Sequence, residues 1–493
     1  MKHPPAPAAR NVAAGTTVSY AAVDLGATSG RVLLAVPSQG ITRVVHRFAN
    51  VPLGQRESLR WNVEQLFQET ITGLALAYRE AESLGTTLAG IGVDSWGVDY
   101  ALLREGQLVA PVRHYRRTSD TVMLDALSVM DAASLYSITG VREQPINTLV
   151  QLFSDKRQGL LDHVDQFLLV PDLWVFWMTG TLGTEPTIAS TTQLFDPLRR
   201  EWSDEIISAF DLPRHILPTI TPTGSVASST SPWFTTKIGA EKPVPVFRVG
   251  SHDTASALAV SRAITGSRTG LVSSGSWTLV AAVTPDPVVT VQSHRQGFTN
   301  EQATDGENLH LHNLNGMWLL EECVRAELGP TAQVDMAALV EQARLIEQPA
   351  EFDLSAAELF SPQQVARTID ELCTESGFPP PVGLAARARA IFESVAGAIA
   401  ASVNESGKPD CVSIVGGGAR NSLLCELVAD RLGVPVLAGP AEATALGNIL
   451  VQAQVDGLPP SEVAKRLVGN SLITYYPDDN GPRANHPWSA PDE

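Results

Sequence analysis

The order of apolar and polar segments predicts an α/β protein with two domains of similar topology. Short apolar runs typical of strands alternate with longer amphipathic segments along the 493 residues, as in mixed sheets flanked by helices. Two predicted hairpins, at residues 19–36 and 270–280, have turns rich in Gly, Ser and Thr and lie about half the chain apart. One such hairpin at the head of each half indicates a repeated architecture.

The composition of the connecting segments predicts the domain boundaries. Residues 213–245 are rich in Pro, Thr and Ser, so we expect an irregular connection there. The first domain is expected to span residues 17–245 and the second residues 246–466. We expect the two ends of the chain, 1–16 and 467–493, to be flexible tails.

Individual elements follow from hydrophobic periodicity. Residues 384–403 carry apolar side chains at helical spacing and predict an amphipathic helix. Asn421 to Leu432 should form another helix, which Gly433 ends. Short apolar runs predict strands at residues 88–93, 244–249, 411–415 and 434–437.

Composition and charge narrow the classes of partner. The formal net charge of −18 argues against nucleic acid or an anionic membrane surface as the main partner, because both need a dense basic face. A small phosphate ligand remains compatible, since backbone N–H groups and a metal ion can hold it. No segment has the length and apolar character of a membrane span or a secretory signal. We therefore expect a soluble, cytoplasmic protein whose four scattered cysteines are buried thiols.

The two hairpin turns are candidate phosphate sites. The first turn carries Thr28 and Ser29 between Asp24 and Arg31, and its backbone N–H groups could cradle phosphate oxygens. Asp24 could hold Mg²⁺ through water. The second turn, residues 273–278, repeats this chemistry, and a triphosphate could lie between the two. The alternative for each is a plain β-turn.

Three consecutive glycines, residues 416–418, follow a predicted buried strand and precede a helix. Without Cβ atoms, this turn lets a ligand approach the backbone, and the adenosine of a nucleotide suits it. The spacing is not that of a dinucleotide-binding fingerprint. The alternative is tight packing of strand against helix.

Carboxylates at predicted strand ends are candidates for binding or deprotonating a hydroxyl group. Asp253 follows the strand at 244–249 and could accept a hydroxyl proton; alternatively, it only caps the next helix. Asp94 and Asp99 flank Trp96 in a turn that could line a polyol pocket, with the carboxylates accepting sugar hydroxyl groups. The alternative is an ordinary polar turn with a buried tryptophan. The histidines have no metal-ligand spacing.

Several short motifs, taken in chain order, resemble those of a known protein family. They are VDLGATSGR (23–31), GVDSWGVD (92–99), INTLVQL (146–152), STTQL (190–194), SHDTASA (251–257), SSGSW (273–277), NLNGMWLLE (313–321), IVGGGARN (414–421) and AGPAEATALGN (438–448). Together they resemble the rhamnulokinase branch of the FGGY carbohydrate kinases, from about residue 18 to about residue 464. The resemblance implies the two-domain ATPase fold of actin, hexokinase and Hsp70, with ribonuclease H-like domains and a cleft between them.

The resemblance also implies roles for single residues. Asp253 would be the base that deprotonates the primary hydroxyl of the sugar. The ATP-binding residues would be Ala27, Thr28, Ser29, Gly30, Arg31, Ser276, Glu321 and Gly417. The sugar-binding residues would be Gly97, His252, Thr254 and Asn313. Rhamnulokinases usually have Asp where this chain has Arg117, and Gln where it has Glu321.

The implied activity is ATP- and Mg²⁺-dependent phosphorylation of L-rhamnulose at its 1-hydroxyl group, a step of L-rhamnose degradation. The nearest alternative is the same chemistry on L-fuculose or xylulose. A non-catalytic sugar sensor on the ATPase fold is a further alternative, but no DNA-reading module is evident. The expected partners are therefore ATP and a ketose, and the sequence leaves the oligomeric state open.

Overall fold

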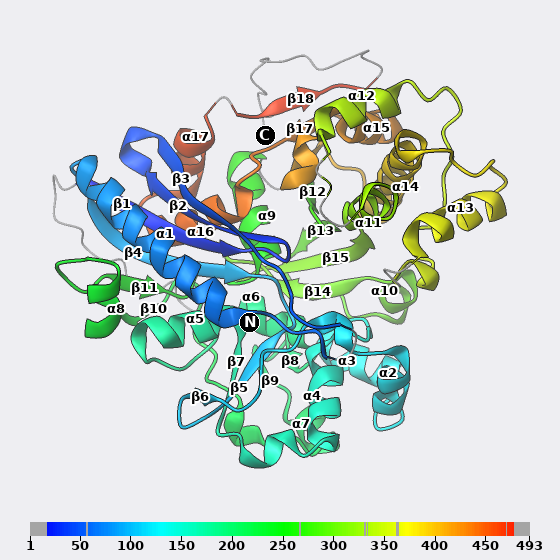
Figure 1. The fold of residues 1–493 in the computed structure, drawn as a ribbon. Coiled ribbons are helices and arrows are strands. Elements are labelled where there is room, and N and C mark those ends of the chain that lie inside the picture. The colour runs from blue at the N-terminus through cyan, green and yellow to red at the C-terminus, as the bar shows by residue number, and fades with distance from the viewer. Residues whose placement is uncertain are drawn as a thin grey trace. The chain divides into compact units, whose positions relative to one another are not determined.

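The computed structural model describes residues 17–55, 58–265, 268–329, 332, 334–360, 364–469 and 471–477. The predicted N-terminal tail, residues 1–16, and the last part of the predicted C-terminal tail, residues 478–493, lie outside them. The chain divides into two compact units (Figure 1). Among the described residues, unit 1 comprises those up to Ala263, Val283–His310 and Thr444–Gly469, and unit 2 comprises Ile264–Ala282, Leu311–Ala443 and those from Ser471 onward.

Unit 1 is built on a six-stranded sheet of order β10-β11-β4-β1-β2-β3. These strands are β1 (Val18–Leu25), β2 (Ser29–Val36), β3 (Ile41–Ala49), β4 (Thr87–Ser95), β10 (Val226–Ser229) and β11 (Pro245–Phe247). β1 pairs antiparallel with β2 and parallel with β4, and the β1–β4 register sets Asp24 opposite Asp94. The carboxyl ends of these central strands therefore bring two acidic side chains to one edge of the sheet.

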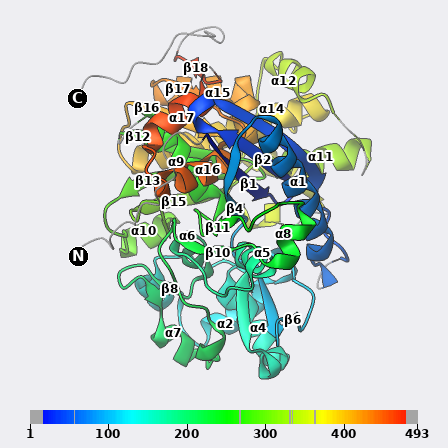
Figure 2. The ribbon, with the colours of Figure 1, turned by 90° about the vertical axis from the view of Figure 1, so that its left-hand side faces the viewer.

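Helices cover this sheet. α1 (Val63–Ser83) packs on β2 and β3, where Gly73 lies so close to Val32 that a Cβ atom would clash. α16 (Ala443–Val455) packs closely on β4: a Cβ atom at Gly92 of β4 would clash with the side chains of Asn448 and Gln452 of α16. Figure 2 shows α16 beside α9 (Asp253–Thr265). The two helices meet at Gly447, whose missing Cβ atom leaves room for the backbone of α9.

The rest of unit 1 is a smaller α/β region. Its three-stranded sheet has the order β6-β5-β7, and β8 pairs with β9. These strands are β5 (Tyr100–Arg104), β6 (Gln107–Leu108), β7 (Gln166–Leu169), β8 (Phe195–Asp196) and β9 (Glu201–Trp202). β14 (Thr299–Gln302) is an edge strand of the second sheet. The other helices of unit 1, some of which contact the six-stranded sheet, are α2 (Asp120–Leu127), α3 (Ala132–Thr139), α4 (Thr148–Arg157), α5 (Val170–Thr179), α6 (Pro186–Ala189), α7 (Asp204–Ala209), α8 (Pro232–Lys237), α10 (Val291–Gln296) and α17 (Pro460–Val468).

The second sheet has seven strands, in the order β14-β15-β13-β12-β16-β17-β18. Besides β14, its strands are β12 (Thr269–Ser274), β13 (Trp277–Thr284), β15 (Asn308–Asn315), β16 (Cys411–Val415), β17 (Val436–Ala438) and β18 (Ile473–Tyr475). β12 pairs antiparallel with β13 and parallel with β16, which repeats the arrangement of β1 with β2 and β4. The two predicted hairpins are thus equivalent elements of the two units.

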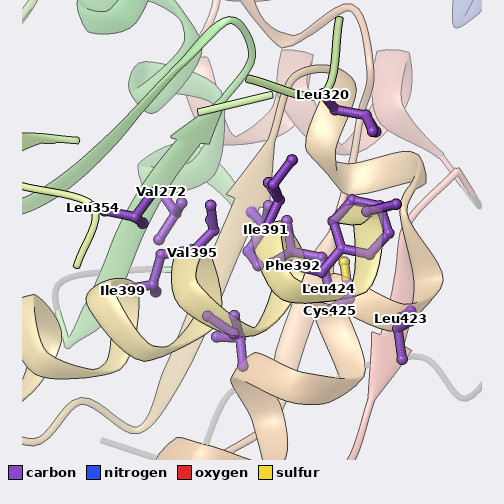
Figure 3. Packing of buried hydrophobic residues seen from close by; sticks show 14 of the residues in the cluster. Val272, Leu320, Leu354, Ile391, Phe392, Val395, Ile399, Leu423, Leu424 and Cys425 are labelled. Atoms are coloured by element: carbon purple, nitrogen blue, oxygen red, sulfur yellow. The ribbon is translucent and has the colours of Figure 1, made fainter. Parts of the chain in front are cut away.

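The core of unit 2 lies between its sheet and its helices. The helices are α11 (Trp318–Leu328), α12 (Met336–Arg344), α13 (Val365–Glu375), α14 (Leu384–Glu405) and α15 (Ser422–Leu432). Ile391, Phe392 and Val395 of α14 are fully buried, and Leu424 and Cys425 of α15 lie in the same cluster (Figure 3). The predicted amphipathic helix at 384–403 is confirmed, because its apolar stripe forms this core.

Three segments differ from the sequence-based expectations. The connection at 213–245 contains α8, with Pro232 in its first turn and Ser231 as its N-cap, and the edge strand β10. The predicted C-terminal tail contains β18, which pairs with β17 and buries Thr474 and Tyr475. Residues 246–263 pack within unit 1, although the predicted boundary at 245 places them in the second domain. The domain boundary itself stays a prediction.

All four cysteines are buried, as expected. In the part of the chain that the structure describes, no single helix is long and apolar enough to cross a membrane. One bent pair, Asp120–Leu127 with Ala132–Thr139, passes the same test of length and composition, with an angle of 83° between its helices.

Candidate active site

The carboxyl ends of β1 and β4 form the acidic centre of unit 1. The Arg31 Nε atom lies 3.1 Å from Asp24 Oδ2. Asp94 is fully buried, and Asn448 Nδ2 donates a 2.6 Å hydrogen bond to its Oδ2 atom. Burial raises the pKa of Asp94 well above its usual range, and the charges of Asp24 and Asp253 raise it further. Three carboxyl groups from different segments therefore interact here.

The turn between β1 and β2 is a preformed loop. The Gly26 N–H group donates to the Ser29 carbonyl oxygen at 2.9 Å. Asn50 holds the turn with two hydrogen bonds. Its Nδ2 atom donates to the Gly26 carbonyl oxygen (2.9 Å), and its backbone N–H group donates to the Thr28 carbonyl oxygen (3.0 Å). Ala27 and Thr28 lie outside the β1–β2 ladder, and Thr28 is exposed. This geometry is compatible with the predicted phosphate site.

Gly30 and Gly97 are glycines for reasons of space. A Cβ atom on Gly30 would lie 2.2 Å from the Phe48 ring. A Cβ atom on Gly97 would lie 3.0–3.1 Å from Thr191, a residue of the STTQL segment. Both predicted site glycines therefore have a packing role, whether or not they also contact a ligand.

The segment before α9 is held on β4 by buried polar contacts. The Ser95 N–H group donates to the Ser251 carbonyl oxygen at 2.9 Å. From the other side, Glu185 Oε1 accepts the Ser251 N–H group (3.1 Å), and Thr187 Oγ1 accepts the His252 N–H group (3.2 Å). Glu185 is completely buried and is a site residue that the sequence analysis missed. These contacts fix the position of Asp253, which begins α9.

Asp253 is a half-buried carboxyl group next to His252, with 32% of its side chain exposed. Burial raises its pKa, while the charge of His252 and the hydroxyl group of Thr254 lower it. His252 Nε2 lies 3.4 Å from Asp253 Oδ1, and Thr254 Oγ1 donates to the same oxygen at 3.2 Å. The Ser256 N–H group bonds to the His252 carbonyl oxygen, so the Asp253 side chain is not engaged there. The predicted sugar-site residues His252 and Thr254 thus flank the predicted base.

His252 has a second carboxylate partner. Its Nδ1 atom lies 3.0 Å from Glu301 Oε2, and the side chains of His252 and Glu301 are 8% and 11% exposed. Burial opposes protonation of this histidine, but the charges of Glu301, Asp253 and Glu185 raise its pKa to about 9. Glu301 was not predicted as a site residue from the sequence.

Asp99 is saturated by protein donors. Its carboxylate accepts hydrogen bonds from Trp61 Nε1 (2.6 Å), Trp96 Nε1 (3.1 Å), Gln151 Nε2 (3.1 Å) and the Tyr115 N–H group (3.3 Å). Burial raises its pKa to about 7 against these bonds. The structure therefore favours a structural role for Asp99, with Trp96 buried beside it, over the predicted acceptance of sugar hydroxyl groups.

Arg117, one of the two departures from the rhamnulokinase pattern, pairs with a buried carboxylate. Its Nη2 atom lies 2.8 Å from Asp155 Oδ1, and only 5% of its side chain is exposed. Arg113 Nη1 (2.7 Å) and the Tyr100 hydroxyl group (2.8 Å) also bind Asp155. The charge at position 117 is therefore compensated locally.

Of the predicted ATP-binding residues, Ser276, Glu321 and Gly417 lie in unit 2. Gly417 has open space where a Cβ atom would be, with no protein atom within 4 Å. In contrast, Cβ atoms at Gly416 and Gly418 would lie 2.8 and 2.2 Å from atoms of Ser274. The outer glycines serve packing against β12, and the middle one leaves the backbone accessible.

Ser276 and Asn313 lie on neighbouring parts of unit 2. The carbonyl oxygen of Ser276 accepts the Trp318 N–H group at 3.3 Å, and a Cβ atom at Gly316 would clash with this turn. Asn313 Oδ1 is buried and has no hydrogen-bond partner among the described residues, so a ligand could satisfy it. Glu321 lies in the first turn of α11 and is exposed.

The predicted residues thus fall into two sets. Unit 1 holds Asp24, the turn at 27–31, Gly97, His252, Asp253 and Thr254, and unit 2 holds Ser276, Asn313, Glu321 and Gly417. Within the described ranges, no group of three or more His, Cys, Asp or Glu side chains could hold a metal ion directly.

Comparison with family models covers most of the chain. Residues 19–259 match the N-terminal domain of the FGGY family of carbohydrate kinases, and residues 270–454 match its C-terminal domain. The chain is 33% identical over 480 residues to a protein named rhamnulokinase from Bacteroides thetaiotaomicron, covering 94% of this chain and 96% of that one. It is 34% identical to rhamnulokinases from Pectobacterium atrosepticum (88% of each chain) and Yersinia pestis (94% and 96%).

Solved structures agree on the fold. A xylulose kinase from Lactobacillus acidophilus matches with a TM-score of 0.74 at 15% identity, covering 93% of this chain and 94% of that one. A glycerol kinase from Plasmodium falciparum, solved with ADP, matches with a TM-score of 0.73 at 12% identity and covers 94% of each chain. The expected two-domain ATPase fold is confirmed. Both family models, in order and over nearly the whole length, show that this chain belongs to the FGGY family of carbohydrate kinases.

Proposed function

We propose that this carbohydrate kinase transfers the γ-phosphoryl group of ATP to the 1-hydroxyl group of L-rhamnulose, which yields L-rhamnulose 1-phosphate and ADP. The observation that carries the choice of substrate is the identity of 33–34% to proteins named rhamnulokinase over 88–94% of this chain. The solved neighbours named xylulose kinase are only 15–17% identical, so they support the fold and not the substrate.

In the proposed reaction, Asp253 takes the proton of the 1-hydroxyl group. That oxygen forms a bond to the γ-phosphorus atom while the bond from this phosphorus to the β,γ-bridging oxygen breaks, and ADP leaves. A primary hydroxyl group is a poor nucleophile at neutral pH, so a carboxylate within hydrogen-bond reach helps when its proton departs. Asp253 suits this task because its carboxylate is half-buried and lies 3.4 Å from the cationic side chain of His252.

The remaining roles follow the chemistry of each position. The backbone and hydroxyl groups of residues 27–31 and Ser276 bind phosphate oxygens, and Gly417 lets adenosine approach the backbone. Gly97, His252, Thr254 and Asn313 contact the sugar, and the unpartnered Asn313 Oδ1 atom would accept one of its hydroxyl groups. Glu321 lies near the nucleotide on α11.

The residues present fit a Mg²⁺ ion held through water. Mg²⁺ usually keeps several water ligands and binds one or two carboxylates together with substrate phosphates. Asp24 provides such a carboxylate, and its charge together with those of Asp94 and Asp253 favours a cation at this edge of the sheet. When bound, Mg²⁺ would neutralise phosphate charge.

The test is a coupled assay of ADP release over L-rhamnulose, L-fuculose, L-xylulose and D-xylulose, with and without Mg²⁺. The proposal expects the highest kcat/KM for L-rhamnulose and no turnover without Mg²⁺. A highest kcat/KM for another ketose would replace the substrate and leave the reaction class. Absence of turnover with every ketose would favour the alternative of a non-catalytic sugar sensor.

A further inference from the structure

Glu301 lies on a short strand that is fixed on both sides. The Asn300 N–H group donates to the Gly140 carbonyl oxygen at 2.9 Å, and the Gln302 N–H group donates to Ser190 Oγ at 3.0 Å. These contacts anchor β14 to the elements that follow α3 and α6. The carboxylate between them therefore has a defined position, and it faces His252.

His252 is held between two carboxylates. Its Nδ1 atom lies 3.0 Å from Glu301 Oε2, and its Nε2 atom lies 3.4 Å from Asp253 Oδ1. A neutral imidazole has one N–H donor and one acceptor, whereas an imidazolium has two donors. A carboxylate oxygen lies within ion-pair distance of each ring nitrogen, so the charges favour the imidazolium form, although the Nδ1 contact to Glu301 lacks hydrogen-bond geometry. The backbone N–H group of His252 also donates to Thr187 Oγ1, which fixes His252 from a third side.

We propose that Glu301 is a positioning residue of this kinase: it holds His252 as an imidazolium against Asp253 and so keeps the carboxylate of the base ionised and oriented. The proposal rests on the proposed role of Asp253 as the base. Glu301 keeps Asp253 ionised through His252, because its own negative charge raises the pKa of Asp253 when it acts directly.

The electrostatic surroundings support this arrangement. The charged groups that act on His252 are Glu301 on β14, Asp253 on α9 and Glu185 before α6, and all three favour its protonation. Asp253 interacts with His252 and Glu301, and also with Asp94 at the end of β4. Asp94 is in turn influenced by Asp24 on β1 and Arg31 on β2. Burial raises the pKa of Asp253, and the imidazolium is its nearest compensating charge.

Loss of the Glu301 charge should therefore act on the base with a defined sign. Burial lowers the pKa of His252, and nearby negative charges raise it. Glu301→Gln removes one of these charges, so the pKa of His252 falls from about 9. Loss of the Glu301 charge by itself lowers the pKa of Asp253, but loss of the imidazolium charge raises it by more. With a neutral imidazole beside it, Asp253 is therefore protonated at higher pH than in the parent protein. The acid limb of the kcat profile then moves to higher pH, and activity returns as the pH rises.

The experiment combines a pH profile with a spectroscopic titration. With a saturating ketose, Glu301→Gln should lower kcat by about tenfold at pH 6.5 and by less than about threefold at pH 8.5. Glu307→Gln is the matched control, because Glu307 lies in the same β14–β15 region and pairs with Arg262 instead. This control should leave the profile unchanged. Glu301→Asp, which keeps the charge, should restore part of the activity at pH 6.5.

Titration of ¹³C-labelled histidine by NMR measures the pairing without any turnover. The His252 signal is assigned by its disappearance in His252→Gln, and it should titrate near pH 9 in the parent protein and well below that in Glu301→Gln. A parent pKa at or below 6.5, or an equal loss of kcat at both pH values, would overturn the inference. If no ketose is phosphorylated, the proposed function fails while the NMR titration still decides whether Glu301 holds the imidazolium. If Glu301→Gln does not fold, the parent titration and Glu301→Asp decide.

Discussion

Gly416, Gly417 and Gly418 are adjacent glycines with different reasons to lack a side chain. The first and third lie against Ser274 of β12, and Gly416 also has a positive φ of 83°. Gly417 faces open space and has no such backbone requirement. The predicted alternatives, tight packing and ligand approach, therefore both hold within one turn, at different residues.

Substitution of the middle glycine separates these roles. Gly417→Val should raise the dissociation constant for ATP by about tenfold or more, since a branched side chain occupies the space that the nucleotide would enter. Ketose affinity and melting temperature should stay near the parent values. Gly418→Val, whose Cβ atom would lie 2.2 Å from Ser274 Oγ, should instead lower the melting temperature. Calorimetric titration of both ligands measures the effect, and equal losses for ATP and ketose would contradict the assignment.

The second prediction for single residues concerns the buried ion pair between Arg117 and Asp155. Arg117→Asp, which introduces the residue usual in rhamnulokinases, would set two carboxylates against each other in a buried site. The free energy of unfolding should fall by about 3 kcal/mol, because a buried charge loses a partner and gains a repulsive neighbour. Arg104→Asp on the exposed end of β5 is the control. Denaturant unfolding provides the measurement, and equal effects of both substitutions would mean that the buried pair contributes nothing.

At the scale of elements, the contact of α9 with α16 positions the acidic centre. A Cβ atom on Gly447 would lie 1.8 Å from the Ser256 carbonyl oxygen. Helix α16 can therefore approach the backbone of α9 this closely only because residue 447 is a glycine. The next residue, Asn448, binds Asp94, and Gln452 donates to Asn448 Oδ1 at 2.8 Å and to the Ala21 carbonyl oxygen at 3.1 Å. This packing therefore connects α9, α16 and the central strands.

A methyl group at this contact should be costly. We expect Gly447→Ala to destabilise unit 1 by about 3 kcal/mol, because overpacked backbone cannot yield as a side chain does. Gly397→Ala in α14 is the matched control, since the nearest atoms to a Cβ atom there are the ends of the flexible Arg431 and Glu351 side chains. That substitution should be neutral or stabilising, as alanine favours helices. Thermal unfolding measures both variants, and a stable Gly447→Ala protein with unchanged kcat would refute the close packing.

Elements with a regular apolar period were predictable, and elements fixed by tertiary contacts were not. The stripe of α14 and the apolar strand β16 were found because their burial follows directly from local spacing. β18 is only three residues long, and its place depends on pairing with β17. α8 lies in a Pro/Thr/Ser-rich segment, where composition suggests a loop, although Pro232 is well suited to a first helical turn.

At the scale of the whole molecule, the motifs located the ligand-facing residues but not the residues behind them. Glu185 supports Ser251 across 66 positions of sequence, and Asn448 supports Asp94 across 354. Glu301 has no local pattern either, since a lone carboxylate on a short strand is typical of an exposed residue. Only the folded chain brings these side chains to the motifs. The family resemblance supplied the activity because its motifs span both halves of the sequence, in order.

The central claim is that Asp253 is the base of a ketose kinase. Asparagine at this position has nearly the same size and can still begin a helix, so the variant separates catalysis from capping. Asp253→Asn should bind ATP normally and keep the melting temperature of the parent protein.

The most direct test is the kcat of Asp253→Asn with saturating L-rhamnulose, ATP and Mg²⁺. We expect kcat to fall by about 10²–10⁴-fold, the usual contribution of a positioned base. A folded variant with near-parent kcat would contradict the account and leave Asp253 as the first residue of α9 and nothing more.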